Sequence, residues 1–516
     1  MRLQSDIEQL IRERVRAHPD ATWLKFKDQQ HSWRELLSNA QRAANGLLKL
    51  GVRPGDRVAI MAGNRPEFIW VYFGILLIGG GFVPLNRWQR GPALEHMVND
   101  AQITLIAFDE DLRDTVHALL PQCASLQRLV VFGDAVAGET AYADLMQSPD
   151  AEPDVEVVAP SKVVDIIYTS GTTGTPKGVY ANVFEAHLTP MRDAIGVRPG
   201  ETLYTCMPLF HGSGLYIGTL GSIRMDAALA LGEKFSASGF WDECRRHGAV
   251  ATHLFSSMFP ILMKQPRRAD DADNPVRRVL SVGCPESSWR EFEQRFGVQI
   301  IESYSMSDAI GMTLNTEGRL GTAGKPMAGA EFRIVDADDR EVPRGEMGEI
   351  TFRHPVGQAT HYHNLPEATA YAYRGGWFHS GDLGRMDTQG YLYFCGRLKE
   401  AIRRRGENIS AWEVASVIDQ HPKVKESAVF GVPSELGEEE VMAAVVPMPG
   451  EQIGAVEIMD FCQGRLAYYA MPRYIDVLPE LPKTGTQKVQ HLALKARGPG
   501  PTTWDREKSG YVVVKR

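Results

Sequence analysis

The sequence predicts an α/β protein with three parts. These are a large N-terminal domain of parallel α/β sheets, an antiparallel β subdomain and a small α+β C-terminal domain. Between residues 1 and 160, strand-like apolar runs alternate with amphipathic helical patterns, as is typical of parallel sheets. After about residue 330, short strands follow one another with turns between them, which indicates antiparallel pairing. From about residue 400, helical and strand patterns alternate again and predict the small domain.

In the N-terminal part, each element follows from the spacing of apolar residues. Residues 6–18 have helical periodicity, and a second helix is expected after Ser32, where Glu35 completes a capping box. The longest uncharged run, 68–84, is short for a membrane span and ends in glycines, so it predicts a buried helix and then a strand. Other buried strands are expected at 57–61, 103–108, 128–132 and 163–168.

In the C-terminal part, the elements are shorter. Strands at 332–335, 348–352 and 391–394 are expected to form the antiparallel subdomain. The small domain is expected to hold helices at 411–420 and 455–465 and strands at 427–430 and 441–446. From Gly498 the chain contains Gly-Pro-Gly-Pro, which predicts a loosely held tail.

Composition limits the class of protein. The chain has 516 residues, of which 43% are hydrophobic and 23% charged, as in ordinary globular proteins. A net charge of -8 argues against non-specific nucleic-acid binding. The first residues carry charges throughout, so no signal peptide is expected. Six scattered cysteines without a C-x-x-C pair argue against a zinc site or disulfides and favour a reducing cytoplasm.

The stretch from Tyr168 to Gly178 is dense in groups that bind phosphate. It reads Tyr-Thr-Ser-Gly-Thr-Thr-Gly-Thr-Pro-Lys-Gly, and its glycines allow close approach of the backbone to a ligand. A Walker A loop needs a hydroxyl residue after its lysine, whereas Gly178 follows Lys177 here. The P-loop NTPase interpretation therefore fails, and a plain polar surface loop is the remaining alternative.

Two other chemistries are excluded by missing motifs. The sequence contains no G-x-S-x-G element, which argues against a serine hydrolase of the α/β type. The run Gly79–Gly81 does not match the dinucleotide motif G-x-G-x-x-G.

The phosphate loop resembles that of the adenylate-forming superfamily, which includes acyl-CoA synthetases, luciferases and adenylation domains of peptide synthetases. Further segments resemble motifs of the same superfamily, in the same order, between about residues 20 and 495. In such enzymes ATP activates a carboxylate as an acyl-AMP with loss of pyrophosphate, and a thiol then displaces AMP. The resemblance therefore implies ATP, Mg²⁺ and coenzyme A as cofactors.

The resemblance also implies the nucleotide contacts. Residues 304–308, Tyr-Ser-Met-Ser-Asp, resemble the segment that holds adenine, phosphate and Mg²⁺. Tyr304 would stack on adenine, Ser307 would donate to phosphate, and Asp308, in place of the usual glutamate, would bind Mg²⁺. Asp382 matches the ribose-binding aspartate, and Arg397 matches an arginine that contacts ribose and phosphate. The implied cofactor-binding residues are Thr169, Ser170, Gly171, Thr172, Thr173, Lys177, Glu302, Ser303, Tyr304, Ser307, Asp382, Arg397, Gly406 and Glu407.

Three residues match catalytic or hinge positions of the superfamily. Lys488 would reach the substrate carboxylate and the α-phosphate, although Gln487 replaces the usual glycine before it. Lys399 would be the hinge about which a mobile small domain turns. His211 stands where amino-acid adenylation domains have an aspartate for the substrate ammonium, and so indicates an acyl or aryl acid.

The resemblance implies domain bounds as well. An N-terminal adenylation domain would span 1–396, a hinge 397–399, a C-terminal domain 400–497 and a tail 498–516. The loop 405–410 would line the pantetheine tunnel.

Spacing around 235–241 and 294–297 resembles the branch that holds crotonobetaine/carnitine-CoA ligases. The predicted function is thus an ATP-dependent carboxylic acid–CoA ligase. An enzyme that loads an acyl carrier protein and a non-catalytic nucleotide-binding paralogue are the alternatives. The acyl pocket is expected from residues 211–216, 252–258, 282–284 and 307–312. The expected partners are the acid and CoA, without nucleic acid or a membrane span, and a homodimer is compatible with the sequence.

Overall fold

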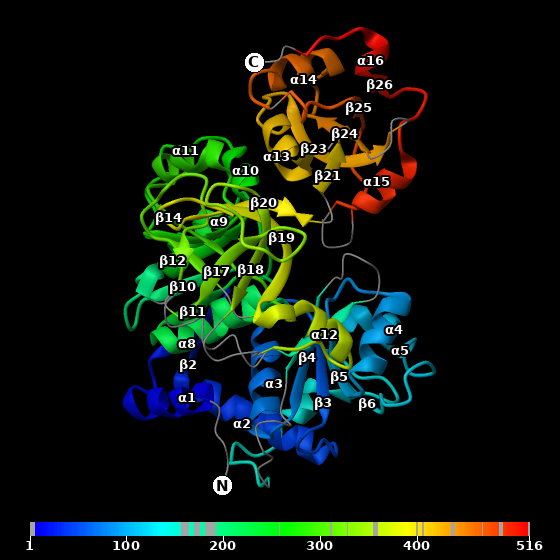
Figure 1. Cartoon of the computed structure of the whole chain (residues 1–516). Coiled ribbons are helices and arrows are strands. Elements are labelled where there is room, and N and C mark those ends of the chain that lie inside the picture. The colour runs from blue at the N-terminus through cyan, green and yellow to red at the C-terminus, as the bar shows by residue number, and fades with distance from the viewer. Residues whose placement is uncertain are drawn as a thin grey trace. The chain divides into compact units, whose positions relative to one another are not determined.

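The structure is a computed structural model of the whole chain. It describes residues 6–155, 165–169, 176–180, 191, 193–256, 258–309, 312–327, 329–353, 360–398, 401–404, 407–434, 439–466, 468–483 and 489–513. The chain forms two compact units. The first comprises Met1–Glu331 with Arg353–Phe378, and the second comprises Phe332–Phe352 with His379–Arg516. Figure 1 shows the elements of both, and each unit is described by itself.

The first unit begins with helices that cover its sheets. Helix α2 (Trp33–Lys49) follows Ser32, and the predicted capping box with Glu35 is present. Helix α3 (Pro66–Leu77) is apolar on all sides and is buried. The predicted succession of a buried helix and a strand is therefore confirmed, because β4 (Gly81–Pro84) follows α3. Helix α1 (Asp6–Ala17) precedes both.

A five-stranded sheet forms one layer of the first unit. Its order is β4-β3-β5-β6-β7, and every pair is parallel. On β3, Val58 and Ile60 belong to the core that contains α3, whereas Ala59 and Met61 belong to the core that contains α4. Side chains alternate across a strand, so helices cover both faces (Figure 1). The remaining elements are β3 (Arg57–Met61), α4 (Gly91–Asp100), β5 (Ile103–Asp109), α5 (Arg113–His117), β6 (Arg128–Phe132), β7 (Thr140–Ala141) and α6 (Tyr142–Leu145).

A nine-stranded sheet is the second layer of this unit, in the order β16-β15-β14-β13-β12-β10-β11-β1-β2. The strands from β14 to β1 pair in parallel, and the strands at both edges are antiparallel. The strands are β1 (Thr22–Phe26), β2 (Gln29–Ser32), β10 (Thr202–Thr205), β11 (Ala228–Leu231), β12 (Ala249–Phe255), β13 (Arg278–Val282), β14 (Gln299–Tyr304), β15 (Thr313–Asn315) and β16 (Lys325–Pro326). The helices are α8 (Gly221–Met225), α9 (Phe240–His247), α10 (Met258–Met263), α11 (Glu286–Phe296) and α12 (Pro366–Ala372).

The second unit contains three small sheets. The first has the order β17-β18-β19-β20, the second is the hairpin β21-β22, and the third has the order β23-β24-β25-β26. The strands are β17 (Glu331–Val335), β18 (Gly348–Arg353), β19 (Phe378–Met386), β20 (Leu392–Arg397), β21 (Ala401–Arg404), β22 (Glu407–Ser410), β23 (Val424–Pro433), β24 (Glu439–Pro447), β25 (Tyr474–Val477) and β26 (Trp504–Asp505). The helices are α13 (Ala411–Ile418), α14 (Ala455–Cys462), α15 (His491–Arg497) and α16 (Arg506–Ser509). The predicted fold class, with parallel sheets, antiparallel sheets and a small α+β part, is confirmed.

The prediction of a loosely held tail from Gly498 is wrong for the described residues up to 513. Strand β26 pairs with β25, and the backbone N–H of Arg506 donates to Arg473 O at 2.9 Å. The hydroxyl of Tyr511 donates to Asp460 Oδ1 at 2.7 Å. The Gly-Pro run is only a connection, because the residues after it supply aromatic and charged side chains that pack on the unit.

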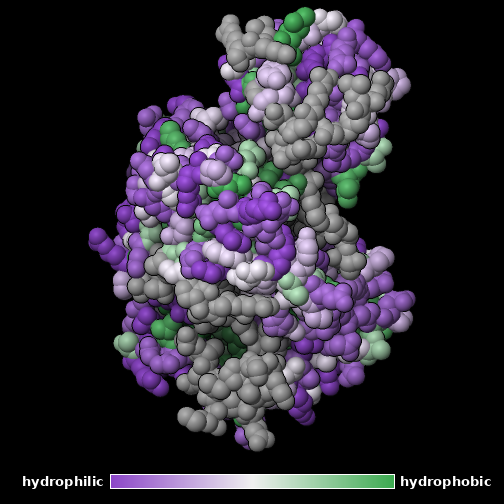
Figure 2. All heavy atoms as spheres, in the orientation of Figure 1, coloured by the Kyte–Doolittle hydropathy of each residue, from purple (hydrophilic) through white to green (hydrophobic). Residues whose placement is uncertain are grey.

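Among the described residues, no helix is long and apolar enough to cross a membrane. Figure 2 shows a face dominated by hydrophilic residues, with hydrophobic ones scattered among them.

The packing of the C-terminal segment leads to a stability prediction. Arg473 is 8% exposed, and its guanidinium lies 3.6 Å from Asp505 and 3.4 Å from Glu507. Deleting residues 498–516 removes two carboxylates from a buried cation and leaves Glu440 Oε1 at 3.6 Å, so the expected loss is at most about 3 kcal/mol. We expect calorimetry to show a lower unfolding midpoint for this deletion than for the full chain. Equal midpoints for the deletion and the full chain would contradict the observed packing.

Candidate active site

The phosphate loop is framed by a β-hairpin. Strand β8 (Ile166–Thr169) pairs antiparallel with β9 (Lys177–Tyr180), and Thr169 is opposite Lys177. The predicted strand before the loop is therefore confirmed from Ile166 onward. Residues 170–175, which include the predicted contacts Ser170, Gly171, Thr172 and Thr173, lie outside the described residues. A return strand after the loop, rather than a helix, agrees with the exclusion of a P-loop NTPase.

A cluster of polar side chains forms hydrogen bonds with both strands of this hairpin. The Tyr168 hydroxyl donates to Asp100 Oδ2 at 2.6 Å, and burial raises the pKa of this phenol, which keeps it protonated as a donor. The Tyr180 hydroxyl lies 2.6 Å from His363 Nδ1, and His363 Nε2 lies 3.0 Å from Asp100 O. Asn364 Nδ2 donates to Asp100 Oδ1 at 2.9 Å. Asp100, at the end of α4, thus connects both strands of the hairpin to the segment around residue 363.

Strand β14 delivers the predicted adenine and metal segment. Glu302, Ser303 and Tyr304 are its last residues, and all three are buried. The Glu302 carboxylate accepts from the Ser281 hydroxyl and from the backbone N–H groups of Gly283 and Cys284. The Ser303 hydroxyl donates to Ser281 O at 2.8 Å. Both side chains join β14 to β13, so their assignment to cofactor binding stays a prediction.

Burial and hydrogen bonding act on Glu302 in opposite directions. Burial is the larger effect and raises the pKa of the Glu302 carboxyl to about 7, while the three donors from β13 and its loop lower the pKa. In the same sheet, burial lowers the pKa of His253 on β12 to about 4, so this imidazole is neutral near pH 7.

Asp308 lies beside the hairpin lysine. The Tyr362 hydroxyl donates to Asp308 Oδ2 at 2.8 Å, and the Thr360 hydroxyl donates to Asp308 O at 2.7 Å. Lys177 Nζ lies 5.1 Å from the centroid of the Tyr362 ring. The ring of Tyr362 therefore connects the cation predicted to bind phosphate with the carboxylate predicted to bind metal.

His211 follows β10 on the segment that leads into a π-helical stretch, Ser213–Leu220. Its side chain is exposed, and its ring centroid lies 4.7 Å from that of Phe210. Gly214 has no room for a side chain, because a Cβ there would lie 2.4 Å from Pro208 O. A π-helical turn is common at functional sites.

In the second unit, β19 and β20 bring together two predicted ribose contacts. Asp382 and Arg397 are opposite each other in the antiparallel register, and Asp382 Oδ1 lies 2.8 Å from Arg397 Nη1. Asp382 is buried, whereas the Arg397 side chain is 43% exposed. Asp382 lies in the middle of β19, and its carboxylate can accept hydrogen bonds from sugar hydroxyls.

Several predicted residues of this unit cannot be placed. Lys399, Gly406 and Lys488 lie outside the described residues, and Glu407 is described only as a backbone position in β22. Residues 407–410 of the predicted loop form β22, which pairs with β21.

The sequence interpretation missed Asp100, Tyr362 and Glu349 as candidate site residues. Asp100 is 68 residues from Tyr168, and Tyr362 is 54 residues from Asp308. Only the fold brings each of these pairs together. The one signal in the sequence is the polar run from His361 to Asn364 before α12.

The fold and the described parts of the site define an adenylate-forming enzyme. The sequence model of the AMP-binding enzyme family matches residues 11–363, and that of the AMP-binding enzyme C-terminal domain matches residues 413–488. The chain belongs to the AMP-binding enzyme family, and its predicted place among acid–thiol ligases of the acyl-CoA synthetase branch is confirmed.

Named relatives and solved structures agree with this assignment to the acyl-CoA synthetase branch. Crotonobetaine/carnitine–CoA ligase of Salmonella agona is 30% identical over 481 residues, which cover 90% of this chain and 93% of the relative. The structure of ATP-bound MatB from Rhodopseudomonas palustris has a TM-score of 0.84 and 26% identity, and the match covers 95% of this chain and 98% of the MatB chain. The o-succinylbenzoate CoA synthetase of Bacillus subtilis, solved with an acyl-adenylate intermediate, has a TM-score of 0.81 and 26% identity, with 94% and 97% covered.

The raised pKa of Glu302 leads to a prediction about pH. A folded pKa near 7, above the ordinary 4.5, means that the folded chain binds this proton more tightly than the unfolded chain. The contribution of Glu302 to the free energy of unfolding is therefore largest below pH 4.5 and falls as the pH rises to about 7. In chemical denaturation between pH 5 and 8, the free energy of unfolding of the wild type, relative to that of Glu302→Gln, should fall as the pH rises. Glu367→Gln, at an exposed position of α12, is the control. A difference between wild type and Glu302→Gln that does not vary with pH would contradict the assignment.

Proposed function

We propose that this chain joins a carboxylic acid to coenzyme A in two steps at one site. In the first step, a carboxylate oxygen attacks the α-phosphorus of ATP, an acyl-AMP forms and pyrophosphate leaves. In the second, the CoA thiolate attacks the acyl carbon, a thioester forms and AMP leaves with that oxygen. The observation that carries this proposal is the grouping of Lys177, Tyr362 and Asp308 beside the phosphate-loop hairpin, in a chain of the AMP-binding enzyme family.

Each unit carries predicted nucleotide contacts. In the first unit, the loop from Thr169 to Lys177 would bind phosphates, Tyr304 would stack on adenine, and Ser307 would donate to the α-phosphate. Support for this arrangement comes from the joined ends of the hairpin and from the position of Tyr304 at the carboxyl end of a parallel strand. In the second unit, Asp382 and Arg397 would hold the ribose.

Asp308 suits a divalent cation. Mg²⁺ prefers hard oxygen ligands such as carboxylates, and it commonly bridges one or two of them to substrate phosphates. With Mg²⁺ bound, the charge of the phosphates is partly neutralised. Tyr362 would hold the Asp308 carboxylate through its hydroxyl, because burial raises the pKa of this phenol and keeps it protonated.

Two lysines and one histidine would complete the chemistry. Lys488 would stabilise the charge that builds on the α-phosphate during acyl-AMP formation. A turn about Lys399 would then replace Lys488 with the pantetheine loop around Gly406. His211 would flank the acyl pocket and control the approach of the thiol. This scheme uses the proposed bounds 1–396 for the N-terminal domain, 397–399 for the hinge and 400–497 for the C-terminal domain, on which β26 packs.

The acid is proposed to be a carboxylic acid without an α-ammonium group. His211 offers no carboxylate to such an ammonium, and the relative from Salmonella agona is a crotonobetaine/carnitine–CoA ligase. Two further points belong to the same proposal. A location in a reducing cytoplasm is supported by six free cysteines, and a homodimer is to be tested by light scattering.

A panel of acids tests the substrate class directly. Linear, aromatic, alicyclic and betaine-like acids should release pyrophosphate from ATP, and a subset should give CoA thioesters. Free α-amino acids should give no release, because a buried ammonium without a partner loses several kcal/mol of solvation. Amino-acid-dependent pyrophosphate exchange, without activity on simple acids, would contradict the proposal.

Separating the half-reactions tests the proposed turn of the small domain. Lys488→Ala should lower the rate of acyl-AMP formation by about 10²–10³, the usual effect of losing one pre-placed donor. The same variant should still convert supplied acyl-AMP and CoA to thioester. Lys399→Pro restricts φ to near -65°, so it should make acyl-AMP but fail to transfer the acyl group. Equal loss of both half-reactions in both folded variants would rule out the domain turn.

A further inference from the structure

Gly381, with its positive φ, makes a local turn at residues 379–381 within β19 (Phe378–Met386), and two hydrogen bonds from outside hold this turn. Ser380 Oγ donates to Ile350 O on β18 at 2.6 Å, and it accepts from the N–H of Asp382 at 3.0 Å. The N–H of Gly381 donates to Glu349 Oε1 at 2.9 Å. Gly381 has φ +68°, a conformation that favours glycine. Because glycine has no Cβ, its backbone can also adopt many other conformations. Bonds from β18 therefore select one conformation of the turn.

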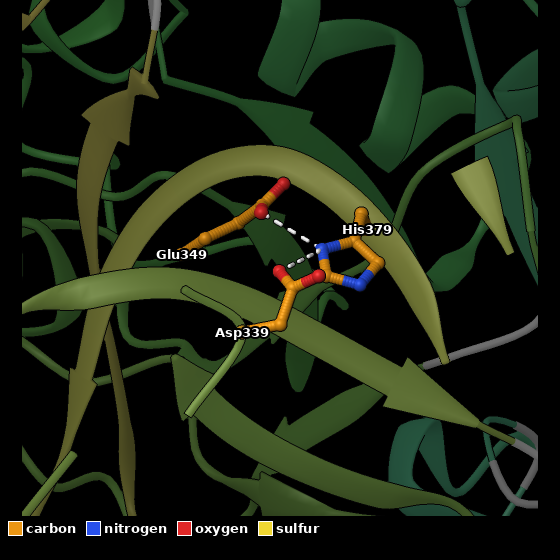
Figure 3. A group of neighbouring side chains, drawn as sticks. All are labelled: Asp339, Glu349 and His379. Carbon is orange, nitrogen blue, oxygen red and sulfur yellow. Dashed lines mark hydrogen bonds and ion pairs between the residues drawn. The ribbon is translucent and has the colours of Figure 1, made fainter. Parts of the chain in front are cut away.

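The second oxygen of Glu349 holds the residue at the start of the turn. Figure 3 shows the ring of His379 with Nδ1 directed at the carboxylates of Glu349 and Asp339. His379 Nδ1 lies 2.9 Å from Glu349 Oε2 and 3.7 Å from Asp339 Oδ1. A carboxylate only accepts, so the imidazole N–H donates in the shorter contact. The Glu349 carboxylate thus bridges His379 and the backbone of Gly381, and the side chains of Glu349 and His379 are buried.

The same three side chains offer ligand atoms within 4.8 Å of one another, which raises the question of a metal ion. Both oxygens of Glu349 already accept hydrogen bonds inside the unit. His379 Nε2 is buried and has no hydrogen-bond partner among the described residues. A metal-bound histidine almost always donates its other N–H to an acceptor. The contacts therefore favour a polar bridge over a metal site.

We propose that Glu349 is a positioning residue for the nucleotide. It acts through the turn 379–381, whose conformation sets where the buried carboxylate of Asp382 stands beside Arg397. The inference rests on the proposed function, in which Asp382 accepts hydrogen bonds from the ribose hydroxyls. Glu349 itself touches neither substrate nor nucleotide in this proposal.

The distinguishing readout is the preference for ribose over deoxyribose. The value of kcat/KM is measured with ATP and with 2′-deoxy-ATP, using an acid that the wild type accepts. The variants are Glu349→Ala, which removes both bonds, and Glu349→Gln, whose amide can still accept from Gly381 N–H and donate to neutral His379. Asp339→Asn is the matched control, since its carboxylate lies farther from His379, and Asp382→Asn reports complete loss of the preference.

We expect the wild type to prefer ATP by about 10- to 100-fold, the range that a hydrogen bond to a charged group contributes. Glu349→Ala should lower this preference about tenfold, while Glu349→Gln and Asp339→Asn keep it within about threefold. If Glu349→Ala does not fold, Glu349→Asp is measured in its place, with the same expected fall.

An equal fall in kcat/KM for both nucleotides, with the preference retained, would overturn the positioning role. Equal effects of Asp339→Asn and Glu349→Ala would overturn it as well. Absence of acid-dependent ATP–pyrophosphate exchange in the wild type would instead overturn the proposed function, so the two failures can be told apart.

Discussion

The parallel pairing of β10, β12, β13 and β14 is the constraint on which the proposed acid and nucleotide contacts of the first unit depend. These strands are neighbours in the sheet, and their carboxyl ends meet at the same edge. His211 follows β10, Gly283 follows β13, and Tyr304 is the last residue of β14. Residues distant in sequence are thereby gathered at one edge of the sheet, where α/β sheets usually bind ligands. At the last of these strands, β14 turns back into the antiparallel β15, and this turn carries Asp308.

Buried or partly buried carboxylates hold these segments in place. Asp100 connects the phosphate-loop hairpin to the segment around His363, and Glu302 holds the loop after β13. Glu349 holds the turn before Asp382. In each case the carboxylate accepts hydrogen bonds from two or more groups, and such donors offset part of the cost of removing the carboxylate from water. The residues proposed to touch the nucleotide thus stand beside acidic residues that fix the local backbone.

The architecture could be predicted because local patterns determine it. Apolar runs identified β3, β5 and β6, and the capping box at Ser32 located the start of α2. The order of the motifs identified the family, because glycine-rich and hydroxyl-rich loops are local signals. The Gly-Pro-Gly-Pro run from Gly498 led to a wrong prediction of a loose tail, because the residues after this run pack on the unit, as β26 does.

The supporting contacts could not be predicted in the same way. Asp100, Tyr362 and Glu349 are ordinary polar residues in the sequence, and their roles depend on partners many residues away. Glu302 was assigned to the cofactor because it precedes Tyr304. The structure shows that its carboxylate is bonded to β13 and the loop after it, which depends on the pairing of two strands and not on the motif.

The central claim is that a carboxylate oxygen becomes bonded to the α-phosphorus of ATP and leaves with AMP. It is tested most directly with an accepted acid whose carboxylate is labelled with ¹⁸O, followed by mass spectrometry of the nucleotide product. The proposed chemistry predicts AMP that carries one ¹⁸O, a thioester that keeps the other, and unlabelled pyrophosphate. Formation of ADP with the label in inorganic phosphate, or of AMP without the label, would contradict it.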